Sequence, residues 1–308
     1  MGLRFASAIV IAAACAAMPP RLAAQAFTAP EGIGSITIAW QVIDNTGHRF
    51  TDGFLLASGQ SKSVSLLAEL DYGITDRLSA TVGIPYVFAK YTGALPPPSR
   101  LPVDACQCWH SAFQDFSLAA RYRFGRRTWG ITPHIRYVRP SHNYPYEGEA
   151  VVGRNLQEIQ VGLTAGLQLE DLLPGASVQA GYTYSFVESP LAEISIDRSN
   201  GFVDFGYALS QRFFARAAGA WQRTHGGLLV GSPTGNPFPL PGQLNTPGRF
   251  AQRDRLISTQ YWQAGGGVSY SLGDLDVFFS VMKYVWGRNA HNGQSYTLGS
   301  TWYFDLSK

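Results

Sequence analysis

The chain has 308 residues, of which 45% are hydrophobic and 13% aromatic, and its 24 basic and 21 acidic residues give a formal net charge of +3. The charged share of 15% is well below the roughly 25% of soluble domains. The mean hydropathy is nevertheless close to zero, which excludes a bundle of membrane-spanning helices. No basic patch indicates a nucleic-acid partner.

The first 26 residues have the features of an export signal. A basic residue precedes an apolar stretch that ends at Met18, and small residues follow at Ala24 and Ala26. Cleavage after either alanine satisfies the small-residue rule, and the stretch is shorter than the about 17 residues of a spanning helix. We therefore expect a signal peptide over 1–26 and a mature barrel domain over 27–308.

The three cysteines fit an oxidising compartment. Cys15 lies in the signal region, where a lipoprotein processing site is the alternative, although the leucine favoured three residues earlier is absent. After cleavage only Cys106 and Cys108 remain, and a pair in an exported protein predicts a disulfide. Metal binding by this pair with Asp104 and His110 is the alternative to a disulfide. We predict neither a metal nor a cofactor.

Strict alternation of apolar and polar residues dominates the mature chain. Between Ser63 and Phe88 it makes two runs joined by a turn at Thr75–Arg77. The apolar face of the first run consists of Val64, Leu66, Ala68, Leu70 and Tyr72. Such period-two alternation predicts strands whose two faces meet different environments.

The same pattern predicts about twelve strands, within a range of about 10–14. They are expected at residues 33–43, 63–72, 78–88, 116–124, 129–139, 159–169, 176–186, 201–210, 213–223, 259–272, 275–287 and 294–305. Most of these exceed the roughly 4 to 8 residues typical of a soluble β-sandwich, which is the structural alternative. We predict an all-β fold, a transmembrane antiparallel up-and-down β-barrel in the outer membrane of a Gram-negative bacterium.

Short and long connections alternate along the chain. Tight turns are expected near residues 75–77, 125–128, 171–175, 210–212 and 273–274, and long polar loops over 44–60, 90–111, 140–154, 188–200, 224–258 and 288–293. In outer-membrane barrels the turns face the periplasm and the loops face the outside. Tryptophans near the loop ends and further aromatic residues near the turn ends fit the two interfacial girdles.

The last expected strand resembles the terminal signal that the barrel assembly machinery recognises. It reads TLGSTWYF, with Thr297, Gly299, Trp302 and Phe304 at the positions that carry the resemblance. A plain aromatic strand end is the alternative interpretation. The expected partners are therefore this machinery, outer-membrane lipid and lipopolysaccharide, and a small-molecule solute.

Three segments together resemble outer-membrane proteins of the phenol meta-degradation pathway type. They are YGITDRLSATVGIPY (72–86), FQDFSLAARYRF (113–124) and PSHNYPYEGEAVVGRNLQEIQVGLTAGLQL (140–169). The chain departs from the usual family pattern at Gln114 and at Pro140–His142. The resemblance implies a barrel channel for small, often hydrophobic or aromatic compounds.

The inward-facing positions of the expected strands collect charges of both signs. The predicted pore-lining residues are Glu69, Asp115, Arg121, His134, Arg136, Glu158, Asp204 and Arg216. Such groups either line a water-filled path or join into a hydrogen-bonded filling, and the sequence leaves both open.

The longest expected loop combines prolines and glycines with apolar residues. Its composition is that of a disordered loop, but the apolar side chains favour burial at the barrel mouth. We predict that Leu228, Leu229, Phe238, Leu240 and Phe250 form an apolar vestibule.

We predict passive passage of small, hydrophobic or aromatic molecules rather than an enzymatic activity. A structural or adhesive barrel is one alternative. An outer-membrane hydrolase is another, but the six histidines are scattered and show no catalytic constellation.

Overall fold

The computed structural model describes residues 26–57, 59–93, 103–231 and 242–306, and the signal region before Ala26 lies outside them. The strands are Ile33–Arg49 (β1), Leu55–Leu56 (β2), Gln60–Gly73 (β3), Leu78–Thr92 (β4), His110–Phe113 (β5), Asp115–Tyr122 (β6), Phe124–Gly125 (β7), Trp129–Pro140 (β8), Glu158–Gln168 (β9), Ala176–Val187 (β10), Ile196–Ala208 (β11), Phe213–Gly226 (β12), Gln260–Leu272 (β13), Leu275–Arg288 (β14) and Ala290–Asp305 (β15). Three short helices precede β13: Gly242–Leu244 (η2), Pro247–Phe250 (α2) and Arg253–Leu256 (η3).

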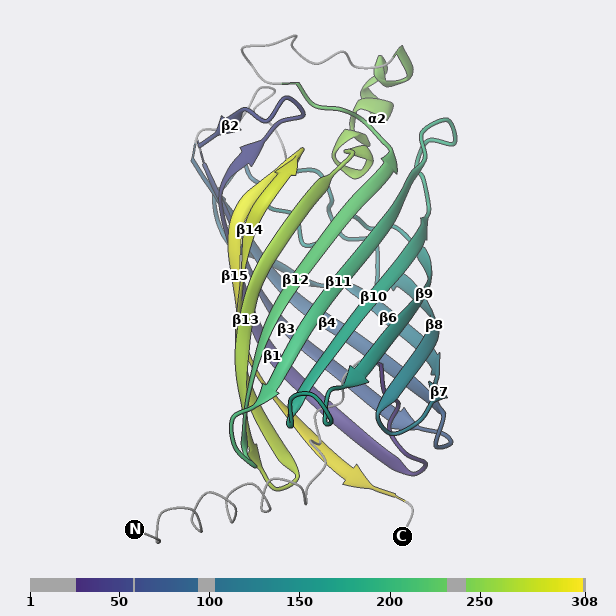
Figure 1. Cartoon of the computed structure of the whole chain (residues 1–308). Coiled ribbons are helices and arrows are strands. Elements are labelled where there is room, and N and C mark those ends of the chain that lie inside the picture. The colour runs from purple at the N-terminus through teal and green to yellow at the C-terminus, as the bar shows by residue number, and fades with distance from the viewer. Residues whose placement is uncertain (1–25, 58, 94–102, 232–241, 307–308) are drawn as a thin grey trace, which may run out of the picture.

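These strands close into one antiparallel barrel (Figure 1). β1 pairs with β15 from Ile33↔Asp305 to Arg49↔Ala290, which joins the first strand to the last. β5, β6 and β7 share one place in the wall, because β5 and β6 both pair with β4, while β6 and β7 both pair with β8. The short β2 pairs only with the last two residues of β1 and adds no strand position to the wall. The barrel thus has twelve strand positions, and the predicted fold class is confirmed.

The described connections have the predicted alternation, with turns at one end of the barrel and loops at the other (Figure 1). Several predicted loops are wrong in extent because strands extend into them, for example β11, which begins at Ile196 inside the predicted loop 188–200. Residues 44–49 belong to β1, and Asn289 alone separates β14 from β15. Asn289 has a positive φ of 46°, a conformation that asparagine tolerates better than most residues. The pattern missed these strand extensions because apolar alternation fades where the wall leaves the membrane.

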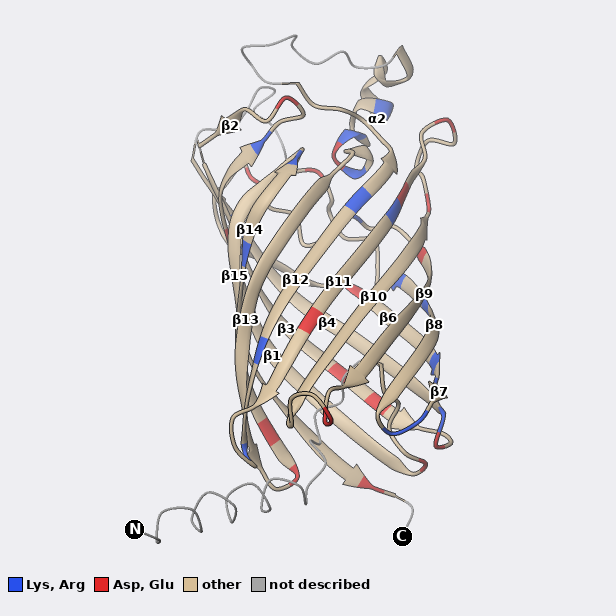
Figure 2. Cartoon of the chain, viewed as in Figure 1, with Lys and Arg blue, Asp and Glu red and all other residues tan. Residues whose placement is uncertain are grey.

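The apolar face of each strand points outward, as a membrane barrel requires. Leu70, Leu163 and Leu298 are 43%, 46% and 56% exposed. Neighbouring inward side chains are buried, for example Thr164, which is 2% exposed. Figure 2 shows few charged positions along the middle of the strands. None of the helices in the described ranges has the length and hydropathy of a membrane-spanning helix.

Aromatic residues mark both ends of the outward face. Near the loops, the Trp221 and Trp262 rings are stacked with centroids 6.0 Å apart, and Trp262 lies in register with Trp286. Near the turns, Trp302 is 53% exposed and the Phe304 ring lies over Gly34 on β1. Interfacial aromatic rings of this kind anchor a barrel in its membrane.

The four residues of the predicted assembly signal all lie on β15, the strand that closes the barrel. Thr297 faces inward, where its Oγ1 accepts a hydrogen bond from Nε2 of Gln41 at 3.2 Å. Gly299 has no side chain, and the Phe278 ring occupies the space that a Cβ would need. Recognition by the assembly machinery stays a prediction.

Candidate functional site: the lumen and its loop-end mouth

Ion pairs join strands on the inner face of the wall, in two cases across an intervening strand. Arg121 on β6 pairs with Asp71 on β3 at 2.7 Å, and Thr81 on β4 donates to the same carboxylate oxygen at 2.7 Å. Arg216 on β12 donates from Nε to Asp204 on β11 at 2.7 Å. The inner face therefore holds its charges as hydrogen-bonded pairs, the arrangement that makes buried charge tolerable.

A third pair lies nearer the loops, where Arg198 on β11 contacts Glu158 on β9. Both side chains are largely buried. Arg198 was not among the predicted pore-lining residues, because its strand was expected to begin at residue 201. The positions on the other face, Asp197, Ser199 and Gly201, carry no apolar side chain, so the period-two pattern gave no signal for this end of β11.

Two predicted inner residues remain partly accessible. Arg136 lies 3.5 Å from Glu69, and their side chains are 37% and 47% exposed. His134 contacts Thr183 through Nε2 at 3.1 Å. At this level of the barrel the polar side chains leave accessible space between them.

Phenyl rings that were not among the predicted pore-lining residues also lie on the inner face. Phe202 alternates with the outward Val203 and covers Gly181 of β10, and Phe214 and Phe278 cover glycines of β11 and β15 in the same way. A Cβ at Gly181 would be 2.2 Å from the Phe202 ring. The glycines allow the rings to lie flat against the wall, so the interior presents apolar as well as charged surface.

The loop between β8 and β9 folds against the inner face of β4. Tyr144, Ala150 and Val152 pack on Val87 and Ala89, and all five are buried. The β8–β9 loop thereby occupies part of the lumen rather than the space outside the mouth.

Polar contacts fix this loop in place. The Tyr144 hydroxyl donates to the carboxylate of Asp115, and the Asp104 carboxylate accepts the backbone N–H groups of Glu149 and Ala150. Asp115, predicted to line a pore, thus holds the β8–β9 loop. Burial, together with the Asp254 and Asp104 carboxylates, raises the pKa of Glu149 to about 7.

Residues 242–257 form a cap over the same mouth, near α2 in Figure 1. Leu244 and Leu256 are 1% and 0% exposed and pack with Leu156, Val187 and Ile196 of neighbouring elements and with Leu228. Arg255 lies over the Tyr146 ring at 4.1 Å and donates from Nε to the carbonyl of Arg154 at 2.9 Å. The cap is therefore attached to the β8–β9 loop.

The predicted vestibule residues have different surroundings. Leu228 is buried in the apolar cluster of the cap, Leu229 is 61% exposed, and Phe250 lies under the Arg253 guanidinium at 4.4 Å. Phe238 and Leu240 lie outside the described residues. The structure does not bring Leu228, Leu229 and Phe250 together on one surface.

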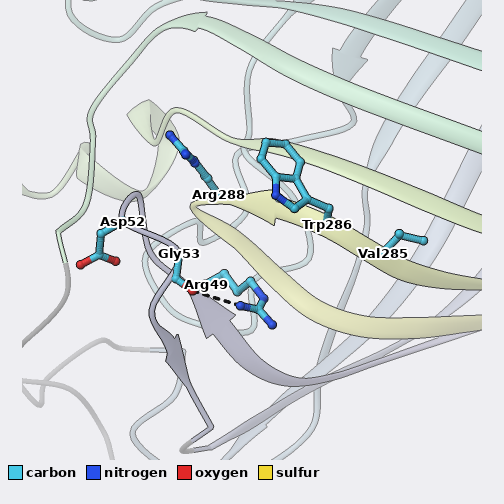
Figure 3. Close-up of a pocket in the computed structure, with 7 residues that line it drawn as sticks. Arg49, Asp52, Gly53, Val285, Trp286 and Arg288 are labelled. Carbon is cyan, nitrogen blue, oxygen red and sulfur yellow. Dashed lines mark hydrogen bonds between the residues drawn. The ribbon is translucent and has the colours of Figure 1, made fainter.

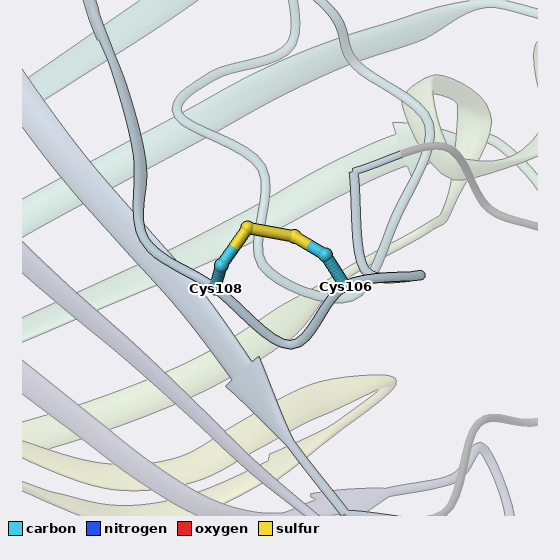
Figure 4. Close-up of a disulfide and its surroundings, with 2 residues drawn as sticks. All are labelled: Cys106 and Cys108. Atoms are coloured by element: carbon cyan, nitrogen blue, oxygen red, sulfur yellow. A yellow bond between two sulfur atoms is a disulfide. The ribbon is translucent and has the colours of Figure 1, made fainter.

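An apolar pocket of about 280 Å³ lies instead beside Cys106 and Cys108, which are joined in a disulfide (Figure 4). Its lining also includes Val103, His110, Pro145 and Val152. The pocket thus lies between the segment before β5 and the β8–β9 loop. It is an apolar surface at the loop end that sequence reasoning missed.

A second pocket, of about 330 Å³, lies at the rim where β1 and β14 end (Figure 3). Arg49 and Arg288 lie on two sides of it, with Trp286 and the 63% exposed Val285 on β14. The register shift between Trp262 and Gln263 makes Val285 the extra residue of a β-bulge, which turns Trp286 outward. This rim pocket therefore belongs to the outer wall rather than to the lumen.

No group of three or more metal-ligating side chains occurs in the described part of the chain. The closed barrel, its outward apolar band and its polar interior define a β-barrel of the bacterial outer-membrane type.

Comparison with known proteins agrees with this class. No protein-family model and no curated protein sequence matches the chain. An outer-membrane channel from Pseudomonas putida F1 is similar in structure, with a TM-score of 0.67 at 12% identity over 93% of this chain and 99% of that one. The translocator domain of autotransporter NalP from Neisseria meningitidis has a TM-score of 0.50 at 14% identity, over 88% of each chain. At such identities the likeness shows the fold.

Proposed function

We propose that the protein is an outer-membrane channel through which small molecules pass passively, with a preference for hydrophobic and aromatic solutes. The observation that carries this proposal is the phenyl surface inside a closed barrel, formed by Phe202, Phe214 and Phe278. A barrel that only needed a polar filling would not place aromatic rings on its inner face, because they offer no hydrogen bonds to paired charges.

The apolar pocket beside the disulfide supports the same proposal. A solute arriving from the loop end would meet this surface before the ion pairs of the lumen. The resemblance to proteins of the phenol meta-degradation pathway type suggests the same solute class. The structural likeness to the Pseudomonas putida F1 channel is consistent with a conducting barrel.

Conductance of the refolded protein in planar bilayers tests the channel itself. Swelling of protein-containing liposomes then compares two solutes of similar size, a sugar and an aromatic alcohol. We expect measurable conductance and faster entry of the aromatic solute. A sealed barrel that hydrolyses lipid or peptide would support the hydrolase alternative, and a sealed, inactive barrel would support the structural or adhesive one.

Variants of Phe278 test the preference. Phe278→Ser removes the ring, whereas Phe278→Leu keeps an apolar side chain of similar volume. We expect the serine variant to lose the preference for the aromatic alcohol and to keep its ion conductance. Unchanged preference in Phe278→Ser, with conductance intact, would contradict a role for this inner ring.

A further inference from the structure

Basic side chains lie on the outward face of the wall just beyond the loop-end tryptophans. These tryptophans are in register across β12, β13 and β14 and are Trp221, Trp262 and Trp286. Two residues nearer the loops on the same three strands, a second row in register consists of Arg223, Gln260 and Arg288. Residues two apart on a strand share a face, so this second row also faces outward, about 7 Å beyond the tryptophans.

Arg49 extends this row from β1. It pairs with Ala290, the first residue of β15, so that it follows Arg288 around the rim. Arg49 and Arg288 lie on two sides of the rim pocket of about 330 Å³ (Figure 3). The exposed side chains of Val285 and Trp286 also line this pocket. The rim pocket therefore combines two cationic groups with apolar surface.

The three arginines of the row keep their positive charge unpaired. Within the described ranges, no carboxylate lies within ion-pair distance of Arg49, Arg223 or Arg288. Asp52 also lines the rim pocket, where its Oδ1 accepts the backbone N–H of Phe54 at 3.0 Å. Two arginines and one carboxylate line the pocket, so it attracts anionic groups.

The position of the row on the outer wall determines which anions reach it. Interfacial tryptophans lie at the level of the lipid headgroups, so side chains just beyond them meet headgroups rather than acyl chains. The loops of an outer-membrane barrel face outside, so these headgroups belong to the outer leaflet. Its lipopolysaccharide carries phosphate groups on the lipid anchor, and guanidinium groups bind phosphate through paired hydrogen bonds.

We propose that Arg49, Arg223 and Arg288 form a site on the outer wall that binds the phosphate groups of a lipopolysaccharide molecule. Arg223 and Arg288 lie two strands apart, about 10 Å by the spacing of a sheet, which fits two phosphates on one headgroup. The sugar and acyl chains then lie against Trp286 and Val285, which a free phosphate would leave uncovered. The site does not depend on the channel function proposed above.

Native mass spectrometry of the protein refolded in detergent measures the binding. The ligands are diphosphorylated lipid A, which is the anchor of lipopolysaccharide, the same lipid without its phosphates, and phosphatidylglycerol. We expect the diphosphorylated lipid to bind roughly tenfold or more tightly than either of the others. Equal binding of the dephosphorylated lipid would overturn the phosphate site. Equal binding of phosphatidylglycerol would overturn the assignment to lipopolysaccharide.

The double variant Arg223→Gln/Arg288→Gln tests the residues. Both side chains are exposed, so the barrel should still fold, and Arg49 is kept because its Nη1 donates to the Gly53 carbonyl at 3.0 Å. We expect roughly tenfold or more weaker binding of diphosphorylated lipid A. Binding of the dephosphorylated lipid should be unchanged, which shows that the variant is folded. Native affinity of the folded variant for diphosphorylated lipid A would overturn the site.

Arg126→Gln/Arg127→Gln is the matched control, because it removes two exposed arginines from the turn before β8, at the opposite end of the barrel. It should bind diphosphorylated lipid A as the native protein does. An equal loss in this control would show that binding follows the overall charge, which would overturn the site.

Inorganic phosphate distinguishes a lipid ligand from a free anion. Added to the native protein at the concentration of the lipid, it should leave diphosphorylated lipid A bound, because it makes no contact with Trp286 and Val285. Displacement of the lipid under these conditions would show that free phosphate is the ligand and would overturn the proposal.

Discussion

At the scale of single residues, the two faces of each strand obey opposite physical requirements. An outward side chain is solvated by lipid and must be apolar, whereas an inward one can be charged if it finds a partner. Arg121 and Asp71 satisfy the second condition at 2.7 Å. Leu163, 46% exposed, satisfies the first. Each face can therefore be tested by a substitution that violates its requirement.

Leu163→Arg should destabilise the folded barrel by about 2–4 kcal/mol if the residue lies near the middle of the membrane. Gln160→Arg is the matched control on the inner face of the same strand, where Gln160 already lies 3.0 Å from a Glu158 oxygen. Thr164, which also faces inward, is not suitable as the control, because its side chain is buried and leaves no space for an arginine. Urea unfolding in liposomes measures both variants. Equal losses would contradict the assignment of the faces.

Arg121→Met should cost about 3–5 kcal/mol, because it leaves the largely buried Asp71 carboxylate without its counter-charge. Arg136→Met should cost at most about 1 kcal/mol, since its pair with Glu69 is longer and partly exposed. The free energy of unfolding in urea compares the two variants. The pair at Asp71 would prove dispensable if Arg121→Met were as stable as Arg136→Met.

At the scale of elements, the loops are folded onto each other and into the mouth. The cap, residues 242–257, is attached through Arg255 and through the leucines that it buries with Leu228. The β8–β9 loop is attached to the wall through Tyr144. Movement of the cap thus requires contacts with the β8–β9 loop to break, and a single arginine makes several of them.

Arg255→Gln should release the cap and raise conductance. It removes the contact with the Tyr146 ring and the hydrogen bond to the Arg154 carbonyl. Arg249→Gln serves as the control, because it removes a surface ion pair with Glu193 at 2.9 Å and a hydrogen bond to the Gln243 carbonyl within the cap but no contact with the β8–β9 loop. Hydrogen exchange of residues 242–257 reports the release. Equal protection in both variants would show that Arg255 does not hold the cap.

Glu149 should make the packing of the two loops pH-dependent. Its pKa is raised from 4.5 to about 7, so the packed state binds a proton more tightly than the unpacked state. The resulting stabilisation is complete below 4.5 and is lost as the pH rises through about 7. Hydrogen exchange of the cap, corrected for intrinsic rates, should show more protection at about pH 5 than at about pH 8.

Glu149→Gln removes this titration. The glutamine resembles the protonated acid, so the variant should keep at about pH 8 the protection that the native protein shows at about pH 5. Asp104 and Asp254, whose pKa values burial also raises, remain in the variant. If Glu149→Gln shows the same pH dependence as the native protein, the dependence comes from Asp104 or Asp254 and not from Glu149.

At the scale of the whole molecule, the difference between the two ends of the barrel sets its orientation. Short turns collect at one end and the cap and long loops at the other (Figure 1). By the rule for outer-membrane barrels, the loops face outside. Residues 26–32, which precede β1 and contact the turn between β3 and β4, then lie on the periplasmic side.

Single-cysteine labelling of intact cells tests this orientation, in a background in which Cys106 and Cys108 are serine. Leu229→Cys lies on the loop side and Leu172→Cys in a turn, and the native leucines are 61% and 83% exposed. We expect an impermeant maleimide to label the first and not the second. Labelling of Leu172→Cys alone would show that the barrel has the opposite orientation, with its turns facing the outside.

The sequence by itself determined the wall of this protein. All twelve strand segments were predictable, because lipid outside and polar groups inside impose alternation on residues such as Val64 to Tyr72, and a period of two is visible locally. Glu69, Arg121 and Asp204 were predictable as inner residues from the same parity. Their pairing was not, since a partner such as Asp71 for Arg121 lies fifty residues away.

Only the tertiary structure decided what fills the barrel and its mouths. The inner position of Phe202 follows from parity, but its place over Gly181 depends on the register of β10 and β11. The cap, the β8–β9 loop and residues 26–32 have no periodicity, and each is fixed by contacts with distant strands. Loop residues do not alternate between lipid and lumen, so their sequence carries no periodic pattern. Their conformation depends on surfaces that exist only once the barrel has closed.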